Sequence, residues 1–307
     1  MIVDSISALR PAFCRAIIVN VSTREVSTLA VLSALRYSNL PVLVIDLEST
    51  DGSWEHFVQL MANEPRLDLC SKSLEKHGNV LDKVFMEARD NTILLIDSDL
   101  EIRDPDVVDS MLEAVKDANV FGAGAIHGPT WLGPLHGFPD KVVLYQQRMW
   151  IPFTILKVAL IKDALREGYS FINRWVPNEL PVVPWLAKAL SMRFFLPVIK
   201  RIQADFLRGT RRTYQNERPN LLCCDTGADM FCHLKYGLGA RFIDFGLDSI
   251  EKKAHHYHGV TRRRLNQRDH NAAAFEEIIG EVLARLHCEY GVDFDVHAKK
   301  ASKAAGV

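Results

Sequence analysis

Short runs of apolar residues alternate with helix-like patterns over the first 126 residues of the chain. Runs rich in β-branched side chains predict buried strands at residues 16–21, 41–47, 92–96 and 120–126. Apolar residues at helical spacing predict helices at residues 27–37, 54–61, 79–88 and 107–117. Strands without a polar face indicate an α/β fold, in which helices cover both faces of a mostly parallel sheet.

The pattern changes after residue 126. Residues 127–137 predict a loop because they hold two His-Gly pairs and two prolines, and residues 152–165 mix strand and helix signals. A helix is predicted within residues 222–236, a short strand at 241–245 and an amphipathic helix at 275–290. The polar tail of residues 298–307 is typical of a disordered segment.

Composition excludes several classes of protein. The 307 residues are 48% hydrophobic and 24% charged, with a formal net charge of -1, so no excess of basic residues points to nucleic-acid binding. The six cysteines include no C-x-x-C pair and are too sparse for a disulfide scaffold. Neither a signal-peptide pattern nor a long apolar run is present, so we expect a cytoplasmic protein with reduced thiols.

The sharpest chemical signal is a pair of carboxylates. Asp97 and Asp99 follow the apolar run 92–96, with Ser98 between them. Ligands bind at the carboxyl ends of the strands in parallel sheets, and two neighbouring carboxylates repel unless a cation separates them. Mg2+ and Mn2+ prefer oxygen ligands and bridge phosphates. The alternative is a turn that carries aspartates only because they favour turns.

A second acidic turn follows the run 41–47 and reads Asp-Leu-Glu-Ser-Thr-Asp-Gly-Ser from Asp46 to Ser53. With this turn and its Asp-x-Asp pair, the chain resembles the GT-A glycosyltransferases, most closely their large family-2-like group. The resemblance covers residues 14–125 well and 150–262 more loosely. It implies a Rossmann-like GT-A sheet with a C-terminal acceptor-side subregion, divided into a nucleotide-sugar-binding half (1–126) and an acceptor-binding, catalytic half (127–297).

The resemblance also implies a site. Asp99, and less directly Asp97, would hold Mn2+ or Mg2+ and the donor diphosphate, and Asp46 would lie near the base or ribose of the nucleotide. The chain departs from the family pattern at Asn20, where proline is frequent, and at Leu47, where a second aspartate is frequent. The implied nucleotide-sugar pocket comprises Val21, Ser22, Thr23, Asp46, Asp51, Lys83, Asp97, Ser98, Asp99 and Arg262. For Lys83, a solvated lysine is the alternative.

Asp225 matches the acidic residue that deprotonates the acceptor hydroxyl in inverting members of the group. The alternative is that Asp225 only caps the helix predicted after it, since aspartate is a favoured N-cap. The residues alone leave both open, and the resemblance favours the base.

Three histidines lie in the four-residue stretch 255–258. His256 and His258 match the place where many GT-A enzymes complete the metal site, and the arginines at 262–264 could clamp phosphate. The alternative is a solvated basic loop.

Residues 174–206 combine tryptophan, phenylalanine, lysine and arginine. Such a segment can lie on an anionic lipid surface, which would suit a lipid-linked acceptor at the inner face of a membrane. The interpretation that the pattern favours is a pair of core helices with exposed basic residues.

The sequence thus predicts a glycosyltransferase that moves a sugar from a nucleotide-diphosphate donor to a hydroxyl of a glycan, a polysaccharide or a lipid-linked acceptor. Two alternatives stay open. One is a haloacid-dehalogenase-like phosphatase with Asp97 as nucleophile, although that motif normally lies on the first strand. The other is a non-catalytic nucleotide-sugar-binding module. A nucleotidyltransferase is disfavoured because no glycine-rich loop follows the first strand.

Overall fold

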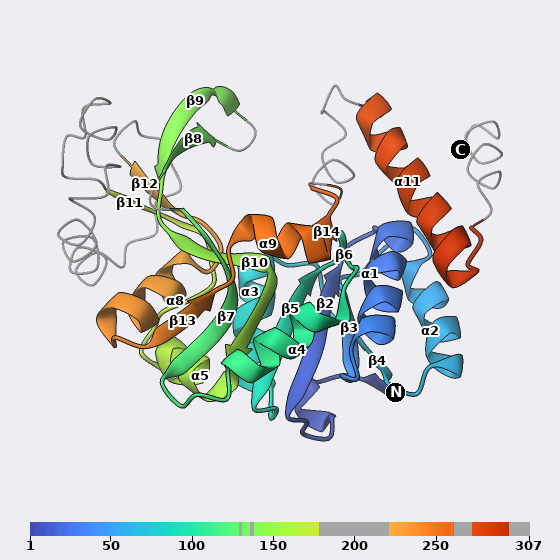
Figure 1. Cartoon of the computed structure of the whole chain (residues 1–307), viewed down its shortest axis with the longest axis horizontal. Coiled ribbons are helices and arrows are strands. Elements are labelled where there is room, and N and C mark those ends of the chain that lie inside the picture. The colour runs from blue at the N-terminus through green and yellow to red at the C-terminus, as the bar shows by residue number, and fades with distance from the viewer. Residues whose placement is uncertain (129–130, 136–137, 178–220, 259, 261–271, 295–307) are drawn as a thin grey trace.

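The computed structural model describes residues 1–128, 131–135, 138–177, 221–258, 260 and 272–294. An eight-stranded sheet has the order β1-β4-β3-β2-β5-β10-β7-β13 (Figure 1). All neighbouring strands are parallel except β10, which is antiparallel to both β5 and β7. The strands are β1 (Ile2–Val3), β2 (Cys14–Asn20), β3 (Val42–Asp46), β4 (Leu67–Ser71), β5 (Thr92–Asp97), β7 (Val120–His127), β10 (Arg148–Lys157) and β13 (Arg241–Asp244). The predicted mostly parallel sheet is confirmed.

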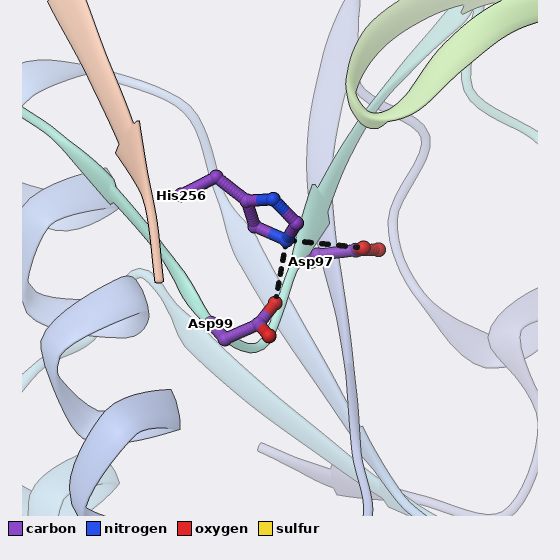
Figure 2. A group of neighbouring side chains, drawn as sticks. All are labelled: Asp97, Asp99 and His256. Atoms are coloured by element: carbon purple, nitrogen blue, oxygen red, sulfur yellow. Dashed lines mark hydrogen bonds and ion pairs between the residues drawn. The ribbon is translucent and has the colours of Figure 1, made fainter. Parts of the chain in front are cut away.

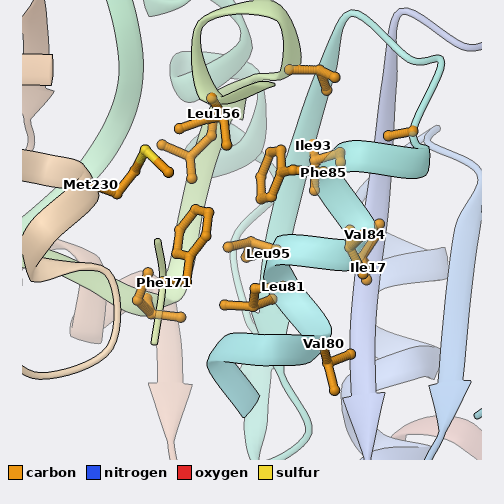
Figure 3. Packing of buried hydrophobic residues seen from close by; sticks show 14 of the residues in the cluster. Ile17, Val80, Leu81, Val84, Phe85, Ile93, Leu95, Leu156, Phe171 and Met230 are labelled. Atoms are coloured by element: carbon orange, nitrogen blue, oxygen red, sulfur yellow. The ribbon is translucent and has the colours of Figure 1, made fainter. Parts of the chain in front are cut away.

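Helices cover both faces of this sheet. One apolar cluster joins it to α1 (Arg24–Tyr37), α2 (Ser53–Asn63), α4 (Pro105–Ala114) and α9 (Leu247–Lys253). A second cluster joins the other face to α3 (His77–Glu87), α5 (Val158–Arg166) and α8 (Ala228–Cys232). Figure 3 shows this second cluster, in which Phe85 of α3 stacks on Phe171 with ring centroids 5.2 Å apart. Burial on both faces explains why the central strands lack a polar side.

A four-stranded sheet stands beside the main one, with the order β11-β12-β9-β8. Its strands are β8 (Trp131–Leu135), β9 (Phe138–Tyr145), β11 (Arg174–Pro177) and β12 (Leu221–Cys224). The predicted loop at 127–137 is therefore wrong for Trp131 and Pro134, which lie on β8. The strand keeps its proline because the register with β9 shifts between Pro134 and Leu135, where a ladder hydrogen bond is not required.

Three further elements, a pair of short strands and one helix, complete the part of the fold that carries the candidate site. The short strands β6 (Leu100–Ile102) and β14 (Ala254–His256) form an antiparallel pair. The helix α11 (Ala272–Tyr290) lies beside α1 (Figure 1). Its Val282 and Leu286 belong to one apolar cluster with Val26 and Leu29 of α1.

The predicted helix at 222–236 needs two corrections. Residues 221–224 form β12, and the helix α8 begins only at Ala228, with Gly227 as its N-cap residue, before a π-helical turn (His233–Gly237). Asp225 is therefore not the helix cap. Gly227 takes that place because its φ of 80° is left-handed, a conformation that glycine adopts without strain. The pair of core helices favoured for residues 174–206 is wrong at its start, because residues 174–177 form the strand β11, and residues 178–206 lie outside the described part. The other predicted elements that the structure describes lie where expected, within a few residues at their ends.

Candidate active site

Two strand ends bring an acidic pair and a histidine together. β5 ends at Asp97, the chain turns through Ser98 and Asp99 into β6, and β14 pairs with β6 so that His256 lies opposite Leu100. The Nε2 atom of His256 is 2.9 Å from Asp99 Oδ1 and 3.9 Å from Asp97 Oδ2 (Figure 2). Residues far apart in sequence thus converge at the carboxyl end of the sheet.

Backbone groups hold Asp99 in this orientation. The N–H of Val260 donates to Asp99 Oδ2 at 3.2 Å, and the N–H of Tyr257 donates to the Asp99 carbonyl at 2.8 Å. The ring of Trp150 on β10 meets the His256 ring edge-on, with centroids 5.6 Å apart. The imidazole is therefore fixed by a carboxylate on one side and an aromatic ring on another.

The charges of the three groups are coupled. Burial raises the pKa of Asp97, and the Asp99 charge adds to that rise. Burial alone would raise the pKa of Asp99 and lower that of His256. Their hydrogen bond and opposite charges, together with the Val260 N–H at Asp99 and the Asp97 charge near His256, outweigh burial, so the pKa of Asp99 falls and that of His256 rises. Asp97 remains the most accessible of the three, with 28% of its side chain exposed against 7% for Asp99 and 10% for His256.

This trio suits a divalent cation. One oxygen or nitrogen atom from each residue lies within 4.8 Å of the others, so Asp97, Asp99 and His256 form a candidate metal group within the described part of the chain. Two carboxylates and one imidazole are a donor set that Mn2+ accepts readily, whereas Mg2+ prefers oxygen alone.

Arg148 extends the site toward Asp225. β10 runs antiparallel to β5, so its first residue, Arg148, lies beyond the carboxyl end of β5. Its guanidinium is 3.0 Å from Asp225 Oδ2, and its charge also lowers the pKa of Asp97. Asp225 Oδ1 accepts from the N–H of Thr226 at 2.8 Å. Sequence reasoning missed Arg148, although a charged residue that opens an apolar strand was a signal.

The predicted nucleotide loops form one hydrogen-bonded unit. Asp46 is only 2% exposed and accepts from Asn20 Nδ2 at 2.7 Å and from the Ser49 N–H at 3.1 Å. Ser49 Oγ accepts from the N–H of Ser22, whose φ of 48° is left-handed. The Asn20 side chain thus donates a hydrogen bond that proline could not make. The buried carboxylate of Asp46 accepts hydrogen bonds from Asn20 and Ser49 and so stabilises the loop that follows β3.

The comparison with protein families favours one of the alternatives. Residues 24–156, a little under half of the chain, match Glycosyl transferase family 2, and this segment contains both Asp97 and Asp99. This match supports a family-2-like glycosyltransferase. A comparison with curated proteins finds no match.

Three solved structures illustrate the distant likeness of this chain to known folds. The mannosyltransferase PcManGT from Pyrobaculum calidifontis, in complex with GDP-Man and Mn2+, is 12% identical, with 98% of this chain and 81% of that chain covered and a TM-score of 0.41. The 4-diphosphocytidyl-2C-methyl-D-erythritol synthase from Anaerococcus prevotii DSM 20548 is 11% identical, with 51% and 74% covered and a TM-score of 0.36. The bifunctional glycosyltransferase WbbM, solved without ligand, is 14% identical, with 52% and 34% covered and a TM-score of 0.37. At such TM-scores, the ligands of those proteins do not transfer to this one.

The remaining predicted donor-site residues make contacts of three kinds: with the acidic turn, with the apolar core and with the start of α1. Thr23 Oγ1 donates to Asn20 Oδ1 and lies 3.3 Å from Ser98 Oγ, so both hydroxyls are buried beside the acidic turn. Val21 is partly buried against the apolar core. Asp51 accepts from the Arg24 N–H at 2.9 Å and thereby ties the turn at 46–53 to the start of α1.

Of the other predicted site residues, Lys83 pairs elsewhere, His258 contacts the trio only through His256, and Arg262 lies outside the described residues. Lys83 is exposed and paired with Glu75, which fits the solvated lysine better than a phosphate contact. His258 contacts the Nδ1 side of His256, opposite to Asp99, and is mostly exposed. Arg262, most of the segment 174–206 and the tail 298–307 lie outside the described residues. Across the residues that are described, none of the helices is both long and apolar enough to span a membrane.

Proposed function

We propose that this glycosyltransferase moves a sugar from a nucleotide-diphosphate donor to a hydroxyl group of a glycan, a polysaccharide or a lipid-linked acceptor, with Mn2+ or Mg2+ as cofactor. The observation that carries the proposal is the convergence of Asp97, Asp99 and His256 at the end of β5. The family match, which includes the acidic pair, supports it.

In this proposal the trio binds the divalent ion. Asp99 is held by the Val260 and Tyr257 N–H groups, so it contributes a fixed ligand, whereas the more exposed Asp97 faces the incoming donor. The bound ion supplies positive charge that stabilises the departing diphosphate. The imidazole of His256 favours Mn2+ over Mg2+.

Asp225 is proposed as the general base of an inverting transfer. Its carboxylate is held by Arg148 and by the Thr226 N–H, and it is partly exposed, so an acceptor hydroxyl can reach it. A general base must stand within hydrogen-bond distance of the proton that it takes. Arg148 lies beyond the carboxyl end of β5, so its contact with Asp225 supports a base near the acidic pair.

The donor class and the metal can be tested together. Thermal unfolding is measured with UDP-, GDP-, dTDP- and CMP-sugars, each with and without MnCl2. We expect one nucleotide class to raise the melting temperature only with Mn2+, because ligands that bind the folded state stabilise it. Asp99→Asn should abolish this rise and the transfer activity, whereas Asp109→Asn, an exposed control on α4, should retain both.

Two outcomes would favour the alternatives. If no nucleotide raises the melting temperature in the presence of Mn2+, the chain is better explained as a non-catalytic module. If the protein hydrolyses a phosphate monoester and nucleotide sugars do not change that rate, the results favour the phosphatase, although the family match weighs against it.

The composition of residues 174–206 suggests the class of acceptor, a lipid-linked one. Its aromatic and basic residues would contact anionic lipid if the acceptor were lipid-linked. Flotation with liposomes that contain anionic lipid tests this contact. A protein that stays at the bottom of the gradient would direct the search toward soluble glycans.

A further inference from the structure

A fully buried carboxylate lies two residues after the acidic pair. The side chain of Glu101 is 0% exposed. Its Oε1 accepts from the Nε of Arg285 at 3.0 Å and from a second guanidinium nitrogen at 2.5 Å, while its Oε2 accepts from Arg103 Nε at 2.8 Å and from the Tyr257 hydroxyl at 3.1 Å. A buried charge is tolerated only when it is paired and hydrogen-bonded, and both oxygens of Glu101 are.

This cluster and the candidate metal group share one short ladder. In the pairing of β6 with β14, Glu101 lies opposite His255, and the next pair joins Leu100 to His256. Asp99 precedes β6 directly. The β6–β14 ladder that brings His256 to Asp99 therefore also contains Glu101, one residue pair further along.

Arg285 comes from a distant element, the helix α11. The apolar side of this helix, at Val282 and Leu286, packs in one cluster with Tyr257 and Val260. Val260 and Tyr257 are the residues whose N–H groups donate to Asp99. The docked helix thus covers the segment that orients a proposed metal ligand.

We infer that Arg285 is a positioning residue: its ion pair with Glu101 docks α11 onto the β6–β14 ladder and so sets the affinity of Asp97, Asp99 and His256 for a divalent cation. The inference rests on the metal site proposed above. Without Arg285, the fold keeps the apolar contacts of α11, but the ladder loses its tie to the helix. His256 and the Val260 N–H then occupy more orientations, and the cation is bound less tightly.

The test measures Mn2+ binding directly. The full chain is titrated with MnCl2, and free Mn2+ is followed by its electron paramagnetic resonance signal. Loss of a group that orients metal ligands weakens metal affinity by about tenfold or more, so we expect Arg285→Met to raise the Kd about tenfold. Arg285→Lys, which keeps the charge, should recover part of the affinity.

Arg36→Met is the matched control. Arg36 also joins α1 to α11, through Glu289, but it is exposed and does not contact Glu101 or the ladder. We expect its Kd to stay within about twofold of the wild-type value, because the groups that orient the metal ligands are intact.

A measurement on the wild-type chain covers the case in which Arg285→Met does not fold. Coupling between two sites is reciprocal, so Mn2+ must slow hydrogen exchange in α11 around Arg285 if docking strengthens Mn2+ binding. The inference is overturned, while the proposed function stands, by either of two results. One is that the folded Arg285 variants bind Mn2+ as tightly as the wild type, and the other is that Mn2+ does not change the rate of hydrogen exchange in α11. If the wild-type chain binds Mn2+ no better than Asp99→Asn, the proposed metal site fails and the inference falls with it.

Discussion

The guanidinium of Arg148 lies 3.0 Å from the carboxylate of Asp225. The positive charge of Arg148 also opposes the rise in the pKa of Asp97, so Arg148 is electrostatically linked to both the proposed general base and the proposed metal group. The two carboxylates come from opposite halves of the chain and are related through an arginine on β10, the antiparallel strand of the main sheet. We therefore expect Arg148 to orient the Asp225 carboxylate relative to the bound donor.

Replacing Arg148 by methionine should therefore slow transfer more than it weakens donor binding. A misplaced catalytic group costs on the order of 100-fold in rate, and we expect kcat to fall by about that factor, with the KM for the donor changed several-fold at most. Initial rates at varied donor concentration separate the two effects. Arg166→Met, which breaks an exposed pair with Asp163, is the control and should leave both values unchanged. An unaltered kcat in the Arg148 variant would show that Asp225 needs no such partner.

Asp225→Asn should remove transfer while the donor still binds. The amide keeps an oxygen for Arg148 and nearly the same shape, but it cannot take a proton from the acceptor hydroxyl, which costs about 100-fold to 10,000-fold in rate. The Mn2+-dependent rise in melting temperature with the donor should persist, because Asp225 is not part of the candidate metal group. Full transfer activity in this variant would exclude Asp225 as the base.

The first half of the fold could be predicted because its strands are buried on both faces. Such strands are continuous apolar runs, as in β2, β3, β5 and β7, and their ends mark the polar edge of the sheet. The strand β4 (Leu67–Ser71) escaped prediction because Asp68 interrupts its apolar pattern to pair with Arg15. The strand β8 escaped because its glycine and its proline are typical of turns, and only its pairing with β9 defines it.

The candidate site was predictable where its residues are local. Asp97 and Asp99 follow one strand, so their proximity is a property of a short segment of sequence. The contact of His256 with Asp99 spans 157 residues, and the sequence could suggest it only through the family resemblance. The Glu101–Arg285 pair spans 184 residues and has no local pattern, so only the docked position of α11 reveals it.

The metal-free protein should show a pH dependence that traces to His256. Despite burial, the hydrogen bond and the charge of Asp99, with the charge of Asp97, hold the pKa of His256 above the usual 6.5. The same contact with His256, with the Val260 N–H, holds the pKa of Asp99 below the usual 3.8. A raised histidine pKa stabilises the fold fully below pH 6.5 and ceases to do so as the pH rises through the folded value. A lowered aspartate pKa stabilises it above pH 3.8. The ion pair therefore contributes most between these limits.

His256→Asn tests this window. In EDTA, the free energy of unfolding of the wild type should exceed that of the variant most near about pH 5.5, and the gap should narrow as the pH rises through the raised pKa of His256. Asp97 contributes with the opposite sign, since burial raises its pKa, but it is present in both proteins. Urea unfolding at a series of pH values measures the gap. A gap that widened with rising pH would contradict the assigned ion pair.

Gly78 should tolerate no side chain. It lies in the first turn of α3, and a Cβ atom there would stand 2.6 Å from the Ile172 Cα and 2.7 Å from the Phe171 carbonyl oxygen. Both neighbours are backbone atoms, so a change of rotamer cannot relieve the clash. Because α3 carries the Phe85–Phe171 stack, any shift also disturbs the core beneath the acidic strand. We expect Gly78→Ala to lower the free energy of unfolding by about 1–3 kcal/mol.

Gly280 in α11 provides the matched control, because it is helical and exposed and a Cβ atom there would meet nothing within 4 Å. Gly280→Ala should raise the free energy of unfolding by about 0.5–1 kcal/mol, since alanine loses less conformational freedom in a helix. Urea midpoints at constant m-value compare the three proteins. If Gly78→Ala were as stable as Gly280→Ala, the segment 171–172 could not lie against α3 as closely as the structure places it, and the packing that supports β5 and its acidic end would need revision.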